Sequence, residues 1–244
     1  MSSGWPTRRV IARVVPPVAL GLVIALVVAL VVVAPAPPER DLDLNNSGVW
    51  VSSDAAGVFG RVNRSAGAVD TVLMDPEYVA GAGLDVLQDQ QTVVGLDTSA
   101  GRVFPVDTRD GVVTEGSDLL VDATGQVALG GGILAWVSGV TGEIRMTAYG
   151  EDEPVVPAAL LSEATVAARL DGVGAGASGV DVAVDGSGRV LAAAVSGSWV
   201  LLVPGAPAVT GTVGPLESVV VTLVAGVGLI ADAATGEITS TTGA

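Results

Sequence analysis

The chain has 244 residues, of which 50% are hydrophobic, and a formal net charge of −15. It contains no Cys and no His, and all 11 of its basic residues are Arg, which excludes disulfides, imidazole chemistry and lysine Schiff bases. All 26 carboxylates but only eight of the Arg residues lie from Glu39 onward, so this part carries a charge of −18. Such a body is expected to repel nucleic acid, and we predict no nucleic-acid partner.

The first element in chain order is an uninterrupted apolar run at residues 18–34. As a helix it would extend about 26 Å, which is enough to cross a bilayer with its flanks. Arg8, Arg9 and Arg13 precede the run and acidic residues follow it, so the N-terminus is expected in the cytoplasm. We therefore predict a basic cytoplasmic head at 1–17, a transmembrane α-helix at 18–34, a Pro-rich spacer at 35–40 and an extracytoplasmic domain at 41–244.

Two alternatives to a membrane anchor remain open for this run. A cleaved signal peptide has the same order of basic, apolar and small-residue regions, and residues 34–36 imitate a cleavage site. However, Pro37 suits a peptidase poorly, and the run is longer than most secretory apolar regions. The other alternative is a buried helix of a soluble domain. The predicted localisation is the cell membrane, with a single span and the C-terminal domain outside.

Beyond the spacer, short Val-rich alternating runs are separated by Gly, Asp, Asn and Ser, which is typical of antiparallel strands. Only Ala158–Leu170 has the period of a helix. Five segments share a strand, a tight turn and a second strand, and their turns end in Gly57, Gly101, Gly142, Gly197 and Gly236. Units of about 40–45 residues with three or four strands are typical of propeller blades. We predict an all-β, propeller-like domain, with a β-sandwich as the alternative.

The stretches Asp41–Asp70 and Leu84–Asp107, preceded by a basic head and one apolar span, resemble the start of large actinobacterial surface proteins. In that family a membrane-anchored, propeller-like region precedes tandem fibronectin type III or Ig-like domains. The resemblance implies a cell-envelope protein, but it implies no catalytic residues. Because the repeat pattern stops partway through its last unit, we expect an incomplete ring of sheets or a piece of a longer protein.

We find no residue pattern that indicates a catalytic, cofactor-binding or metal site. Asp41–Asn46 and Asp181–Gly188 place oxygen atoms near turns but lack the spacing of a calcium loop, so ordinary turn hydrogen bonding explains them better. The glycines at 172–179 do not match a phosphate-binding loop, and the serines have no His partner. We therefore predict that the protein is not an enzyme and needs no cofactor.

Three Trp residues fall on comparable predicted strands of three repeat units and are the candidate ligand contacts: Trp50, Trp136 and Trp199. Such rings can bind sugars, although in propellers they more often fill the space between sheets. The predicted function is a membrane-anchored binding or scaffolding module of the cell envelope, with the membrane and a cell-wall or protein partner. The alternative is a glycosidase-like enzyme, or a part of one, that acts on extracellular polysaccharide through paired carboxylates.

Overall fold

The computed structural model describes residues 48–63, 67–74, 83–113, 119–120, 122, 124–150, 164–174 and 179–242. All of them lie in the unit Leu44–Ala244. The predicted cytoplasmic head with its three Arg residues, the predicted membrane helix and the Pro-rich spacer lie outside the described residues and stay predictions. Within the described ranges, no helix is long and apolar enough to cross a membrane.

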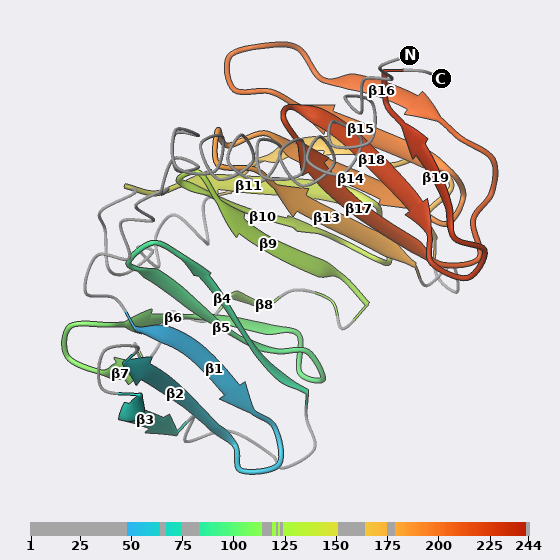
Figure 1. The fold of residues 1–244 in the computed structure, drawn as a ribbon. Helices are drawn as coiled ribbons and strands as arrows, with labels where there is room; N and C mark the ends of the chain where they lie inside the picture. The colour runs from blue at the N-terminus through green and yellow to red at the C-terminus, as the bar shows by residue number, and fades with distance from the viewer. Residues whose placement is uncertain are drawn as a thin grey trace, which may run out of the picture. The chain divides into compact units, whose positions relative to one another are not determined.

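The described strands form five antiparallel sheets that follow one another along the chain, here named sheets A to E (Figure 1). Sheet A contains β1 (Val49–Ser53), β2 (Val58–Asn63) and β3 (Ala68–Met74). Sheet B contains β4 (Leu84–Asp89), β5 (Thr92–Asp97), β6 (Arg102–Asp107), β7 (Val112–Val113) and β8 (Leu119–Leu120). Sheet C contains β9 (Gln126–Gly130), β10 (Ile133–Val137), β11 (Glu143–Ala148) and β12 (Val166–Arg169). Sheet D contains β13 (Val180–Val184), β14 (Val190–Ala194), β15 (Ser198–Leu202) and β16 (Val209–Thr212). Sheet E contains β17 (Val219–Val224), β18 (Val227–Asp232) and β19 (Glu237–Ser240).

The five predicted turn glycines all close hairpins, with φ between 63 and 86°. The turn before β19 shows why this local sequence folds as it does. The N–H of Gly236 donates to the carbonyl of Asp232 at 2.7 Å, and the Asp232 carboxylate accepts the N–H of Ala234 at 3.0 Å. Positive φ strains any residue with a side chain, so Gly belongs at the end of the turn. The predicted hairpin chemistry is confirmed.

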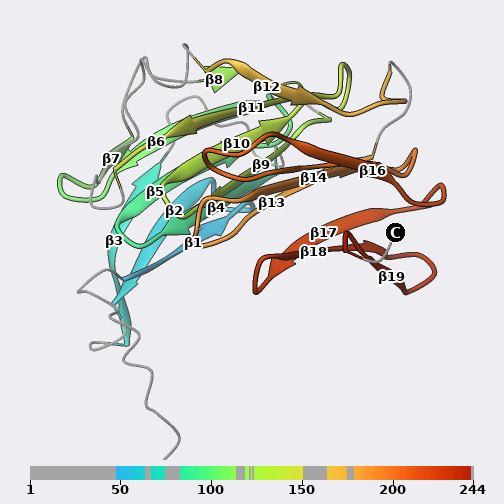
Figure 2. The ribbon, with the colours of Figure 1, turned by 90° about the horizontal axis from the view of Figure 1, so that it is seen from above.

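An apolar cluster lies between each pair of successive sheets, which therefore pack face to face (Figure 2). The first strands of sheets B to E, which are β4, β9, β13 and β17, contact one another in succession. Alternating residues of one strand serve different clusters: Val93 of β5 packs toward sheet A, whereas Val94 packs toward sheet C. This confirms the prediction of an all-β fold with repeated, propeller-like packing of small sheets.

The predicted helix at Ala158–Leu170 is wrong in its described part. Val166–Arg169 forms β12, the outer strand of sheet C, and pairs with β11. Arg169 reaches across this pairing to Glu143, with Nη2 2.7 Å from Oε1. The helical spacing of apolar residues in this segment expresses only a weak local preference for a helix. Pairing with the otherwise exposed edge of β11 overrides that preference. Residues 158–163 lie outside the described ranges.

Candidate functional site

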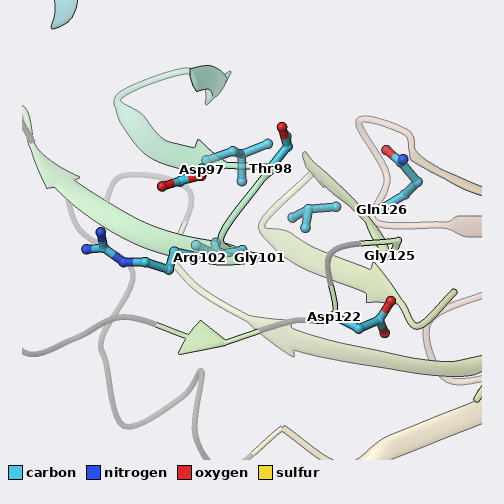
Figure 3. Close-up of a pocket in the computed structure, with 10 residues that line it drawn as sticks. Asp97, Thr98, Gly101, Arg102, Asp122, Gly125 and Gln126 are labelled. Carbon is cyan, nitrogen blue, oxygen red and sulfur yellow. The ribbon is translucent and has the colours of Figure 1, made fainter. Parts of the chain in front are cut away.

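A pocket with a volume of about 70 Å³, open to solvent, lies where the ends of strands from sheets B and C meet (Figure 3). It is smaller than the roughly 300–1,000 Å³ pockets that enclose drug-sized ligands. Sheet B contributes the end of β5, the turn after it and the start of β6, and sheet C contributes the start of β9. The lining residues are Leu96, Asp97, Thr98, Gly101, Arg102, Val103, Asp122, Gly125, Gln126 and Val127.

Asp97 is a buried carboxylate that holds the turn on the sheet B side of the pocket. Its Oδ1 accepts the N–H groups of Ser99 and Ala100 at 3.1 and 2.9 Å, and the hydroxyl of Ser99 at 2.9 Å. Asp side chains favour such turns because they satisfy the N–H groups of the turn itself. Asp97 therefore fixes the position from which Arg102 starts β6.

Asp122 holds the opposite side of the pocket in the same way. Its Oδ1 accepts the N–H and hydroxyl of Thr124 at 3.2 and 2.8 Å, and the N–H of Gly139 at 3.1 Å. Burial alone would raise the pKa of Asp122, but hydrogen bonds from Ser138, Thr124 and Gly139 outweigh it and lower the pKa. Asp122 is therefore a stable carboxylate and a weak proton acceptor.

The charged groups of the pocket do not converge on one point. Figure 3 shows Asp97 and Arg102 on one side of the pocket and Asp122 and Gln126 on the other. The Arg102 guanidinium carbon lies 5.6 Å from the centroid of the Phe104 ring, in a cation–π arrangement. Both carboxylates accept hydrogen bonds from turn N–H groups, and such oxygen atoms can also accept ligand hydroxyls.

The three candidate Trp residues are all buried, with 5% of Trp50, 6% of Trp136 and 4% of Trp199 exposed. Trp50 packs in the cluster between sheets A and B, and Trp199 packs in the cluster between sheets D and E. Their strands are not all equivalent, because Trp50 and Trp136 precede the hairpin turn of their sheet and Trp199 follows it. Contact of these rings with a ligand stays a prediction.

The acidic stretch at Asp181–Gly188 contains most of β13 and part of the turn that connects β13 to β14. Asp185 Oδ1 accepts the N–H groups of Ser187 and Arg189 at 2.8 and 3.1 Å. In the part of the chain that the structure describes, no group of three or more acidic side chains could hold a metal ion. The other acidic stretch considered, Asp41–Asn46, lies outside that part.

Several polar side chains bridge neighbouring sheets, among them Gln88 and Asp181, for which we did not predict this role. The Gln88 side-chain amide makes the two hydrogen bonds that a backbone peptide group of a paired strand would make. Its Oε1 accepts the N–H of Trp50 at 3.0 Å, and its Nε2 donates to the carbonyl of Gly48 at 3.1 Å. Asp181 Oδ2 accepts the N–H of Val221 at 2.8 Å. Burial raises the pKa of Asp181, although the N–H groups of Val221 and Val182 oppose this shift.

Replacing Asp181 with Asn is expected to remove a pH-dependent loss of stability. Asn has no charge to bury and still accepts the N–H of Val221. Because the raised pKa favours the protonated folded state, the contribution of Asp181 is greatest below the ordinary aspartate pKa and is lost as the pH rises through the raised value. The variant should therefore gain stability relative to the wild type as the pH rises through this window, measured by urea denaturation.

Asp122→Asn is the matched control for this prediction, because the pKa of Asp122 is lowered. A lowered pKa contributes stability above the ordinary aspartate pKa, and that stability is lost as the pH falls through the lowered value. Asp122→Asn should therefore be less stable than the wild type at neutral pH, with a deficit that shrinks in acid. A pH dependence of the same sign for both variants would contradict the assignment.

No family model and no curated protein matches the sequence. Among solved structures, the chain is similar to a catalytically inactive virginiamycin B lyase from Staphylococcus aureus with quinupristin, at 10% identity and a TM-score of 0.53. It is also similar to a streptogramin B lyase, at 10% identity and a TM-score of 0.51. BamB from Moraxella catarrhalis is similar at 11% identity and a TM-score of 0.52. Each alignment covers 80% of this chain, which spans 63, 65 and 55% of those three chains, respectively.

These similarities correct the prediction that the protein is not an enzyme. That prediction relied on the absence of Cys, His and Lys and of known catalytic motifs. The two lyases show that a similar fold accommodates catalysis. At 10% identity, their active-site residues cannot be located in this chain by sequence. The missing residue types exclude particular chemistries, but they do not exclude a catalytic role for the fold.

Proposed function

We propose that the chain is a carbohydrate-active domain whose pocket between sheets B and C binds one sugar unit of an extracellular polysaccharide. The main support for this proposal is the mixture of apolar and hydrogen-bonding side chains in the pocket lining. Leu96, Val103 and Val127 form its apolar part, while Thr98 and Gln126 supply hydrogen-bonding groups beside it. A sugar presents apolar ring faces and hydroxyl edges, and it needs this combination of contacts.

The two pocket carboxylates support a neutral, hydroxyl-rich ligand over an anionic one. The lining includes two carboxylates, Asp97 and Asp122, and one basic residue, Arg102, so it carries a net negative charge. Carboxylates held by turn N–H groups are good acceptors for ligand hydroxyls. A fold that is also found in lyases supports action on the bound substrate, beyond binding alone.

The proposal includes the location of the domain. The apolar run at 18–34, with Arg8, Arg9 and Arg13 before it, supports a membrane anchor with the sheets on the outer side. In that position the domain meets cell-wall or extracellular polysaccharide. Its net negative charge suits contact with neutral sugars better than contact with anionic lipid.

Gln126→Ala is expected to weaken sugar binding about tenfold, because it removes a hydrogen-bonding amide from the pocket. Gln126 is exposed on β9, so the fold should be unaffected. We would titrate the full chain with neutral and acidic oligosaccharides by calorimetry and analyse the same mixtures for products by mass spectrometry.

Thr210→Ala, at an exposed position of β16 outside the pocket lining, is the control and should leave binding unchanged. Equal loss in both variants would contradict the pocket assignment. Failure of every oligosaccharide to bind or react would contradict the proposed substrate class.

A further inference from the structure

The outer face of sheet A is apolar, and none of the described residues covers it. Val51, Gly60 and Val72 form a cross-strand row at its centre. Val51 is 43% exposed and Val72 is 60% exposed, and a side chain at Gly60 would touch Val51 and Val69. By strand alternation, the face carries no charged side chain. Its members are Val49, Val51, Ser53, Val58, Gly60, Val62, Val69, Val72 and Met74.

The outer face of sheet E has the same character. Val220, Val224 and Ile238 are 47, 54 and 66% exposed on it. Ala231 pairs with Val220 and with Ile238, which places these side chains on one face. Again no charged side chain belongs to the face, although the whole chain carries a net charge of −15.

Positions equivalent to these exposed residues are buried in the inner sheets. Ser53 and Asp97 occupy the same place in their hairpins, four residues before the turn glycine. Val49 of β1 and Val93 of β5 each stand four residues before that position, but Val49 is 42% exposed and Val93 is 0% exposed. Counted from Asp232 and Asp97, Ile238 corresponds to Val103, which is 1% exposed. The repeat thus places on both end sheets the residue types that it buries between sheets elsewhere.

We propose that the outer face of sheet A packs on the outer face of sheet E of a second copy of this chain, and that both such contacts form in a closed pair. Each sheet inside the chain presents one kind of face to its predecessor and the other kind to its successor, and sheets A and E expose the two complementary kinds. Contact between E and A therefore repeats the packing seen four times within the chain.

Charge and area both favour a second copy. Two strongly acidic molecules approach with least repulsion through faces that carry no charge. Three strands about 4.8 Å apart and about 20 Å long present roughly 300 Å² per face. One contact then buries about 600 Å² in total, and two contacts bury about 1,200 Å², which is the lower limit of stable interfaces. The closed pair reaches this limit, and a single contact does not.

The absence of Cys from the sequence permits a direct test by cross-linking. Packed sheets lie about 10 Å apart, so a bis-maleimide of about that span should join a Val72→Cys copy to an Ile238→Cys copy of the full chain in its membrane. The two copies carry different tags. We expect a cross-linked species of two chains in the mixture and none from either variant alone.

Val209→Cys, on the exposed outer strand β16, replaces Val72→Cys in the control mixture and should give no product. Adding Val51→Glu to the Val72→Cys copy should lower the yield about tenfold, because it buries an unpaired charge at the contact. The same addition of Val209→Glu should have no effect. Absence of the mixed product, equal yield with the Val209→Cys control, or products longer than two chains would overturn the proposal.

Discussion

Replacing Phe104 with Ala is expected to lower the free energy of unfolding by about 3–5 kcal/mol. The ring of Phe104 is 0% exposed and meets Phe59 of sheet A edge to face, with centroids 5.6 Å apart and planes at 68°. Its loss opens a cavity between sheets A and B and removes the aromatic surface beneath the Arg102 guanidinium. Chemical denaturation followed by circular dichroism measures the change.

Gly95 provides a test that the loss comes from this particular packing. Gly95 pairs with Phe104 across β5 and β6, and a Cβ at Gly95 would overlap the ring. Gly95→Ala alone should therefore cost about 1–3 kcal/mol by overpacking. In the Phe104→Ala background it should cost almost nothing, because the space is vacant. Additive losses in the double variant would show that the two residues do not share this space.

Replacing Trp199 with Ala is expected to cost about 3–5 kcal/mol, because the ring fills the cluster between sheets D and E. Trp199→Phe should cost within about 1 kcal/mol. The indole Nε1 is buried and has no hydrogen-bond partner among the described residues, so its removal relieves an unpaired donor and offsets part of the lost packing. Denaturant unfolding of both variants measures the difference.

Gly211 is the matched position for this pair, since it lies opposite Trp199 on β16 and a Cβ there would overlap the indole. Gly211→Ala should destabilise the wild type and be nearly neutral beside Trp199→Ala. A loss for Trp199→Phe as large as that for Trp199→Ala would contradict the assignment of the indole as a space-filling group without a polar role.

The hairpins could be predicted because their causes are local. Asp97 and Gly101, or Asp232 and Gly236, stand four residues apart, and each Asp accepts hydrogen bonds from N–H groups of its own turn. The helix predicted at Ala158–Leu170 was wrong because its described end is decided by pairing with β11, which no local pattern reveals.

The site could not be predicted because its parts come from different repeat units. Asp97 and Arg102 belong to sheet B, whereas Asp122 and Gln126 precede or begin sheet C. Only the packing of the two sheets brings them to one pocket. The bridge from Asp181 to Val221 likewise joins residues 40 positions apart. The segments LDVLQD (residues 84–89) and VDVAVD (residues 180–185) both have an Asp at their second position, Asp85 and Asp181. This repetition indicated a structural role, but alternation along a strand does not show which neighbouring sheet the Asp faces.

Hydrogen–deuterium exchange of the full chain, with and without a binding oligosaccharide, tests the proposed site most directly. We predict that the ligand slows exchange in two separate segments that line the pocket, Leu96–Val103 and Gly125–Val127, and leaves sheets D and E unchanged. Slower exchange confined to β13–β19, with no effect at either lining segment, would contradict the assignment of the pocket between sheets B and C as the substrate site.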